Sequence, residues 1–181
     1  YYNGQRAVND VARQLRSEIT ARIADHLQTF LSTPHQINGM NARAIQNGAL
    51  SLQDAAALQH YFWEQVQFFP SVTSIYLGTV QGGSAGGGRE GAGGYLYVTG
   101  TERLEVGAFE KYMTDSLGAR LERVATVPNF DARTRPWFVG AVEKGGPVWS
   151  NIYVLLPAMI WPSQPASRFM MPGIICWVWS R

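Results

Sequence analysis

The sequence has few of the cysteines and histidines on which disulfide-rich proteins and many metalloproteins depend, and it lacks the common hydrolase motifs. It has one cysteine, Cys176, which excludes an internal disulfide and a cysteine-rich zinc site. Its histidines, His26, His35 and His60, do not have metal-ligand spacing. Serine-nucleophile, zinc-protease and paired-carboxylate signatures are missing as well. We therefore expect no enzymatic activity, no metal and no cofactor in this chain.

Charge and long apolar runs are also scarce. The net charge is only +2, and lysine and arginine are scattered among acidic residues, so nucleic acid is not an expected partner. No run of about 18 apolar residues is present, so no part of the sequence is expected to span a membrane. Since the chain starts at Tyr1 rather than at methionine, we expect a piece of a longer or processed protein.

Helical periodicity is the strongest pattern in the first third of the chain. Over residues 5–47 an apolar stripe recurs in steps of three and four, and Pro34 predicts a bend or a break. A helix of this length cannot be buried in so small a domain. We therefore expect it to project, to lie along the domain or to pair with a second copy. The apolar stripe consists of Val8, Val11, Leu15, Ile19, Ile23, Leu27 and Leu31.

A second helix is predicted to begin at a Ser51 cap and to run to Pro70. Short β-rich segments follow, "SVTSIYLGTV", "GYLYVT", "RLEVGAFEKYM" and "ARLERVATV", which are typical of an antiparallel sheet. The glycine-rich stretch 81–94 is predicted to be a flexible loop, and it lacks the Lys-Ser/Thr ending of a phosphate-binding loop. A short helix with Pro136 in its first turn and Gly145 as its stop precedes a strand in "PVWSNIYV". These elements predict an α+β fold.

Three regions are predicted: a long N-terminal helix over residues 1–50, a module over 51–156 and an atypical tail over 157–181. The tail has no Asp or Glu, yet it holds three of the six tryptophans and three of the five methionines, with no helix or strand period. One interpretation is an apolar appendage that packs on the domain or on a partner. The other is a reading frame that slipped near residues 157–159. When the possible codons of residues 159–179 are read two bases later, they permit the sequence "DLAISASKPVYDAGNNLLGV", which is typical of a strand, a turn and a second strand. In this interpretation the fold of the present chain is incomplete at its C-terminus.

The stretch "NFDARTRPWF", residues 129–138, gathers two arginines and an aspartate among three aromatic residues. A buried arginine needs a carboxylate, a carbonyl or a ligand anion beside it. In a structural interpretation, Asp131 caps the following helix and holds an arginine. In a functional interpretation, Arg135 is a fork for a carboxylate, with Trp137 and Phe138 as walls of the site. Residue chemistry alone leaves both interpretations open.

Residues 129–153 resemble the signature of Cache sensor domains. This signature runs Tyr/Phe-Asp-x-Arg-x-Arg-Pro-Trp-Tyr/Phe and continues Gly-x-x-x-Trp-Ser-x-x-Tyr, with Asp131, Arg133, Pro136 and Trp149 at structural positions. The resemblance implies a double-Cache, PAS-like domain on the extracytoplasmic (periplasmic) face of a bacterial membrane, in a receptor whose membrane spans lie outside this chain. Such receptors feed a histidine kinase, a cyclase or a chemoreceptor module.

The resemblance also implies a binding site for a small-molecule ligand. In amino-acid-binding members, an arginine, a tryptophan and a tyrosine of the signature hold the ligand carboxylate, and Arg135, Trp137 and Tyr153 match these positions. Phe130 and Phe138 are also predicted to line the ligand site. They stand where those members often have tyrosine, and the later aspartate that holds the ligand amine is absent. A small carboxylate, an amino acid, an amphiphile and no ligand at all therefore stay open.

The expected mechanism is a shift of the sheet against the long helix, which passes a small displacement through the membrane. A homodimer through the N-terminal helix is the expected protein partner. Two other functions stay open. One is a ligand-free dimerisation scaffold of such a receptor, and the other is a secreted solute-binding protein.

Overall fold

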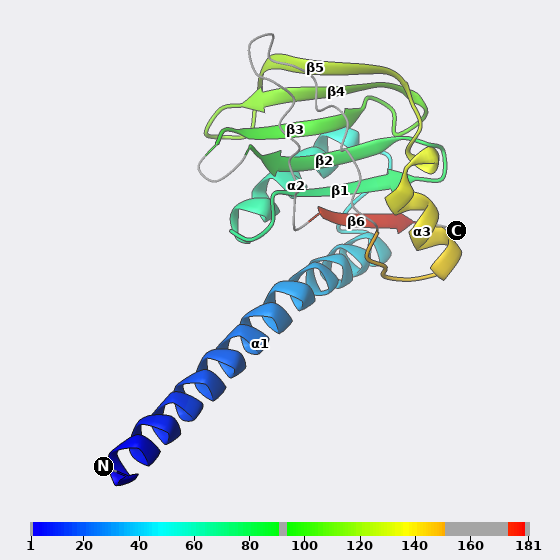
Figure 1. The fold of residues 1–181 in the computed structure, drawn as a ribbon. Helices are drawn as coiled ribbons and strands as arrows, with labels where there is room; N and C mark the ends of the chain where they lie inside the picture. The colour runs from blue at the N-terminus through cyan, green and yellow to red at the C-terminus, as the bar shows by residue number, and fades with distance from the viewer. Residues whose placement is uncertain (1, 91–93, 151–173, 180–181) are drawn as a thin grey trace. The chain divides into compact units, whose positions relative to one another are not determined.

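The computed structural model describes residues 2–90, 94–150 and 174–179, with side chains in residues 4–90 and 94–150. The fold is α+β, as the sequence predicts. It has a long N-terminal helix, a sheet whose first five strands are antiparallel, and further helices (Figure 1). The chain divides into two compact units, residues 1–36 and residues 37–181.

Helix α1 (Tyr2–Gln46) supplies the first unit and continues into the second. Pro34 does not break the helix, although it removes one backbone donor. The helix continues because its later turns are held by packing: Ile37 and Ile45 lie in the core of the second unit. Within the described ranges, no helix is long and apolar enough to cross a membrane.

Helix α2 (Ala55–Gln67) begins later than predicted. Asp54 rather than Ser51 is its N-cap, because the Asp54 carboxylate accepts a hydrogen bond from the Ala57 N–H at 2.9 Å. The Ser51 hydroxyl accepts instead from the Gln53 N–H at 3.1 Å, in the preceding turn. Serine and aspartate are both favoured caps, so the sequence pattern does not separate them.

The sheet has the strand order β5-β4-β3-β2-β1-β6 (Figure 1). Neighbours from β1 to β5 pair antiparallel as a meander, and β6 pairs parallel with β1. The four predicted strand segments are confirmed as β1, β3, β4 and β5. The strands are β1 (Ser74–Thr79), β2 (Ser84–Arg89), β3 (Leu96–Thr101), β4 (Gly107–Thr114), β5 (Arg120–Phe130) and β6 (Ile174–Trp179).

Strand β2 shows that the prediction of a flexible loop over 81–94 is wrong for most of that stretch, of which residues 91–93 lie outside the described residues. Its glycines are needed for close packing. A Cβ at Gly87 would lie 2.3 Å from the backbone nitrogen of Trp63, because α2 packs directly against the strand. A Cβ at Gly88 would lie 2.4 Å from the ring of Tyr97 on the other face. A glycine run inside a strand therefore marks close backbone approach here, not flexibility.

The core of the second unit lies between α2, the end of α1 and one face of the sheet, which we call the helix face. A buried hydrogen bond of 2.8 Å from Gln65 Nε2 to Asn41 Oδ1 ties α2 to α1. The apolar core residues are Ile37, Ile45, Leu50, Ala55, Leu58, Phe62, Val66, Val72, Ile75, Leu77, Ala85 and Leu104.

After β5 the chain forms a short 3₁₀-helix, η1 (Ala132–Thr134), and helix α3 (Pro136–Lys144). The predicted ends of α3 are confirmed: Pro136 is its first residue, and Gly145 closes it in the left-handed region at φ +64°. The strand predicted in "PVWSNIYV" is absent from residues 147–150, and the rest of it lies outside the described residues.

Residues 174–179 are the part of the tail that the structure describes. The sequence shows no regular period there, yet residues 174–179, "IICWVW", form strand β6. A continuous apolar run without alternation is typical of a parallel strand, and β6 pairs parallel along the whole of β1, from Ser74 to Thr79.

Candidate ligand-binding site

The sheet face opposite α2 carries a different set of side chains. Because side chains alternate along a strand, Tyr76 points away from its helix-face neighbour Leu77. Strand register then places Tyr76, Gly86, Thr99 and Lys111 side by side across β1 to β4. We call the face that bears this row the aromatic face.

Helix α3 packs its first turn against the β1 end of the aromatic face. Trp137 and Phe138 are both buried, with exposed fractions of 5% and 6%. The Trp137 ring meets Tyr76 edge to face at a centroid distance of 5.0 Å. A Cβ at Gly78 would lie 2.5 Å from the Trp137 ring, so glycine is required beneath it. These contacts fix both aromatic side chains of the signature against β1.

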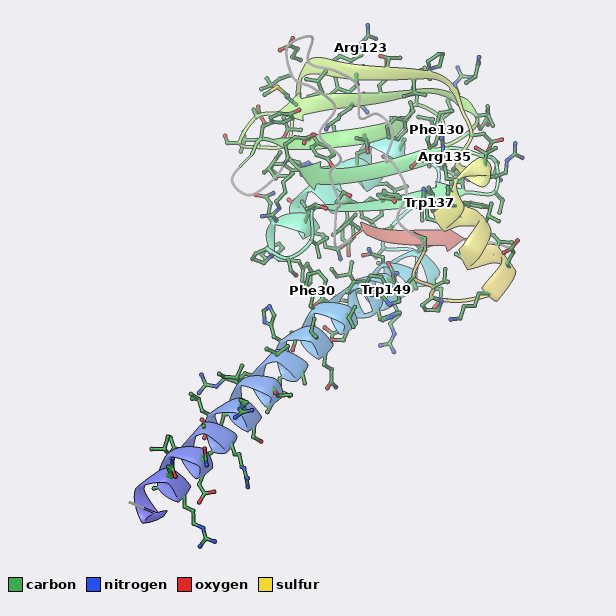
Figure 2. All side chains as sticks on the ribbon, in the orientation of Figure 1. Phe30, Arg123, Phe130, Arg135, Trp137 and Trp149 are labelled. Carbon is green, nitrogen blue, oxygen red and sulfur yellow. The ribbon has the colours of Figure 1, made fainter. Side chains whose placement is uncertain are left out.

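Arg135 lies at the junction between η1 and α3, close to Phe130 and Trp137 (Figure 2). Its guanidinium carbon is 4.7 Å from the centroid of the Phe130 ring, and that ring stacks on Phe109 at 4.6 Å. The Arg135 Nε atom is buried and has no hydrogen-bond partner among the described residues. A buried donor without an acceptor is unfavourable. An anion bound at this position would therefore be stabilised by a charge-assisted hydrogen bond.

Asp131 and Arg133 form a closed pair beside this arginine. The Asp131 carboxylate accepts from the Arg133 backbone N–H at 2.9 Å, from its Nε at 2.9 Å and from its Nη2 at 2.7 Å. The hydrogen bond from the Arg133 side chain lowers the pKa of Asp131. The Ala132 N–H donates to the Gly82 carbonyl at 2.8 Å and anchors this corner to the β1–β2 turn.

The remaining residues of the signature are placed as follows. Pro136 begins α3, and Trp149 is 47% exposed in the segment after α3. Tyr153 lies outside the described residues. Of the five predicted binding residues, the structure brings four together around the start of α3: Phe130, Arg135, Trp137 and Phe138.

Sequence reasoning missed a second charged group on the aromatic face. Lys111 is 9% exposed, and its Nζ forms an ion pair with Glu90 and lies 3.9 Å from the centroid of the Tyr97 ring. Burial, with the Glu90 charge as a smaller cause, raises the pKa of Tyr97. Alternation in "GAFEKYM" could have placed Lys111 on the same face as Phe109. Its partner Glu90 could not be placed on this face, because residues 81–94 are predicted from the sequence to be a flexible loop.

Within residues 4–90 and 94–150, no group of three or more His, Cys, Asp or Glu side chains could hold a metal ion. Comparisons with protein-family models, with curated proteins and with solved structures found no match. The resemblance of residues 129–153 to the Cache signature therefore stays a prediction from the motif alone.

Proposed function

We propose that this chain is the extracytoplasmic ligand-sensing domain of a bacterial membrane receptor, and that it recognises a small carboxylate through Arg135. The observation that carries the proposal is the Arg135 guanidinium, which lies over Phe130 with a buried Nε that has no acceptor among the described residues. The motif resemblance supplies the cellular setting and the receptor class, a histidine kinase, a cyclase or a chemoreceptor.

The chemistry of the site favours a ligand with an anionic head and an apolar body. Arginine presents a planar fork of donors that matches the two oxygens of a carboxylate. Phe130 and Phe138 carry no hydroxyl, so they offer apolar surface rather than further hydrogen bonds. A carboxylate on Arg135 therefore accounts for the polar part of recognition, and the rings contact the rest of the ligand.

Strand β1 provides the route from the ligand to the long helix. On the aromatic face Tyr76 contacts Trp137, which belongs to the proposed site. On the helix face its neighbours Ile75 and Leu77 pack in the same cluster as Ile37 of α1. A ligand that moves β1 relative to α2 also moves the core that holds the end of α1. In a receptor, a small displacement of this helix would carry the signal.

A thermal-shift screen of organic acids and amino acids tests the proposal. We expect at least one carboxylate to raise the Tm of the wild-type chain, because a ligand that binds the native state stabilises it by mass action. This shift should disappear in Arg135→Met. Arg103→Met is the matched control, since it removes the same charge from an exposed position. A Tm shift that persists in Arg135→Met, or that is lost in both variants, contradicts the assignment.

We also propose that the chain forms a homodimer through α1. The supporting observation is that all seven side chains of the predicted apolar stripe are exposed, from 47% at Leu31 to 69% at Val8. An apolar surface of this length is typical of a helix that pairs with another helix. A ligand-free scaffold would need the same surface, so dimerisation alone does not distinguish it from a sensor.

Sedimentation equilibrium tests the dimer. We expect a monomer–dimer equilibrium in the wild type and a monomer in Ile19→Lys, because a charge in the centre of the stripe would be buried in the dimer. Arg16→Glu, which changes charge on the same helix without replacing an apolar side chain, should remain dimeric. A wild type that stays monomeric at all concentrations excludes this interface. A dimer with no hit in the ligand screen favours the scaffold.

A further inference from the structure

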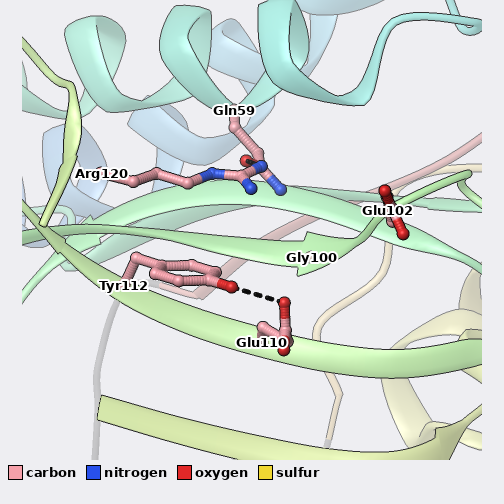
Figure 3. A pocket seen from close by; sticks show the side chains of 6 residues that line it. All are labelled: Gln59, Gly100, Glu102, Glu110, Tyr112 and Arg120. Atoms are coloured by element: carbon pink, nitrogen blue, oxygen red, sulfur yellow. Dashed lines mark hydrogen bonds between the residues drawn. The ribbon is translucent and has the colours of Figure 1, made fainter. Parts of the chain in front are cut away.

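The helix face of the sheet contains a polar cavity on the opposite side from the proposed carboxylate site. Its volume is about 200 Å³, and its lining is strongly polar (Figure 3). Gly100 of β3 lies opposite Glu110 of β4 in its floor, and Gln59 reaches it from α2. The lining residues are Gln59, Gly100, Glu102, Glu110, Tyr112 and Arg120.

Close packing requires a glycine at position 100 in the cavity floor. The φ of Gly100 is +151°, and a Cβ there would lie 2.8 Å from the Gln59 Nε2 atom and 2.3 Å from the Ser84 carbonyl oxygen. The Gln59 side chain is largely buried, with its residue only 4% exposed. The amide is nevertheless placed to line the cavity. The site thus combines a buried polar side chain, Gln59, with exposed charged side chains at its rim, Glu102 and Arg120.

The charged side chains around the cavity are held in place by one another. Arg120 Nη2 donates to Gln59 Oε1 at 2.5 Å, and the Arg120 guanidinium carbon lies 5.0 Å from the centroid of the Tyr112 ring. The Tyr112 hydroxyl donates to Glu110 Oε2 at 2.6 Å, and Arg123 Nη1 donates to Glu110 Oε1 at 2.7 Å. These contacts fix the directions of Gln59, Glu110, Tyr112 and Arg120 before any ligand enters.

Among the charged side chains that line the cavity, only Glu110 forms an ion pair within the described ranges. Glu110 is neutralised by Arg123, and the hydrogen bonds from Tyr112 and Arg123 lower its pKa, so it stays ionised. Glu102 and Arg120 carry opposite charges, yet no ion pair within the described ranges joins either of them to another side chain. Figure 3 shows the Arg120 guanidinium beside Gln59, with Glu102 apart from both. A carboxylate and a guanidinium thus line one cavity without neutralising each other.

We propose that this cavity binds a small zwitterion. The ligand ammonium group pairs with the Glu102 carboxylate, and the ligand carboxylate accepts hydrogen bonds from Arg120 and from the Gln59 amide. A molecule with both charges can pair with Glu102 and Arg120 at once, neither of which has an ion-pair partner within the described ranges, whereas a singly charged molecule can pair with one of them. At about 30 Å³ per water molecule, the volume admits on the order of seven non-hydrogen atoms, so the ligand has a short skeleton.

Isothermal titration with three molecules of one skeleton tests this assignment: β-alanine, propionate and propylammonium. The titrations use Arg135→Met, so that the proposed carboxylate site on the aromatic face does not contribute. We expect β-alanine to bind about tenfold more tightly than either singly charged analogue, because a hydrogen-bonded charge contributes on this order. Tighter binding of propionate than of β-alanine overturns the proposal.

Two variants identify the residue that holds the ammonium group. Glu102→Gln should weaken β-alanine binding about tenfold and leave the affinity for propionate unchanged. Glu105→Gln is the matched control, since it removes the same charge from an exposed position three residues away that does not line the cavity. Equal effects of the two substitutions, or no effect of Glu102→Gln, overturn the proposal. Because both residues are exposed, neither substitution is expected to disturb folding.

Discussion

The helix face and the aromatic face belong to the same strands but are packed in different ways. On the helix face, aliphatic side chains of β1 meet Leu58 and Phe62 of α2, and the backbone of the helix touches Gly87. On the aromatic face, Tyr76 and Trp137 meet edge to face, and Arg135 lies over Phe130 with a buried donor that has no acceptor among the described residues. The apolar packing of the helix face therefore serves stability, whereas Arg135 on the aromatic face has bonding capacity left for a ligand. Substitutions that separate stability from binding test this difference.

The largest loss of stability is expected from truncation on the helix face. Phe62 is 1% exposed, so Phe62→Ala should lower the free energy of unfolding by about 3–5 kcal/mol. Phe68, the C-cap residue of α2, is 79% exposed, and Phe68→Ala should change that free energy by about 0.5 kcal/mol or less. Urea unfolding of the two variants measures both values. Equal losses would mean that α2 does not pack as described.

A smaller loss is expected where the helix touches the strand. Gly87→Ala places a Cβ against the backbone of Trp63, which cannot move away as a side chain would, so we expect a loss of about 3 kcal/mol. Gly39→Ala in α1 has no atom within 4 Å of the new Cβ and should instead gain about 0.5–1 kcal/mol from helix propensity. Urea unfolding of each variant beside the wild type measures both effects. The midpoint should fall in Gly87→Ala and rise in Gly39→Ala. A neutral Gly87→Ala would contradict the strand assignment of this stretch.

On the aromatic face, removal of the arginine should not reduce stability. Arg135→Met removes a buried donor that has no acceptor within the described residues, so the free energy of unfolding should be unchanged or slightly higher. The same variant should lose the Tm shift produced by a carboxylate. A loss above about 2 kcal/mol would place Arg135 in the structural group instead, as expected for the break of a buried pair.

The smallest effect on the Tm is expected at the ion pair between Asp131 and Arg133, whose groups already bond to each other. The hydrogen bond from Arg133 lowers the pKa of Asp131 in the folded chain, so ionised Asp131 stabilises the fold above its unfolded pKa. This contribution is lost as pH falls through the folded pKa, from about pH 4 downward. The Tm of the wild type should exceed that of Asp131→Asn at pH 7, and the difference should narrow by pH 3. A difference that is independent of pH would contradict the assigned cause.

Much of this fold is predictable from local sequence patterns. Apolar periodicity and the Pro136 and Gly145 signals identify α1 and α3, since both depend on neighbours along the chain. The glycine strand β2 is not predictable in this way. Its glycines are required by close contacts with Trp63 of α2 and with Tyr97 of the neighbouring strand β3, so local propensity indicates a loop where packing requires a strand. Pro34 fails as a helix stop for the same reason, because packing further along holds the helix.

The residues of the candidate site also differ in whether the sequence alone could identify them. The motif residues Phe130, Arg135, Trp137 and Phe138 are adjacent in sequence, and the sequence could name them together. Tyr76, Lys111 and Glu90 come from three other parts of the chain, and only the strand register brings them to the same face. The polar cavity on the helix face has no motif at all, since α2, β3, β4 and β5 each contribute to it.

The central proposal is that a carboxylate which raises the Tm binds at Arg135 on the aromatic face, and tryptophan side chains report on both faces of the sheet. Trp137 lies on the aromatic face, and Trp63 lies on α2, where its Nε1 donates to Thr114 at 2.8 Å. With 5-fluorotryptophan incorporated and resonances assigned by Trp→Phe variants, ¹⁹F NMR follows each ring during titration with monocarboxylates that lack an ammonium group. The account predicts that a carboxylate which raises the Tm shifts the Trp137 resonance and leaves that of Trp63 in place. A carboxylate that raises the Tm without moving Trp137 would contradict it.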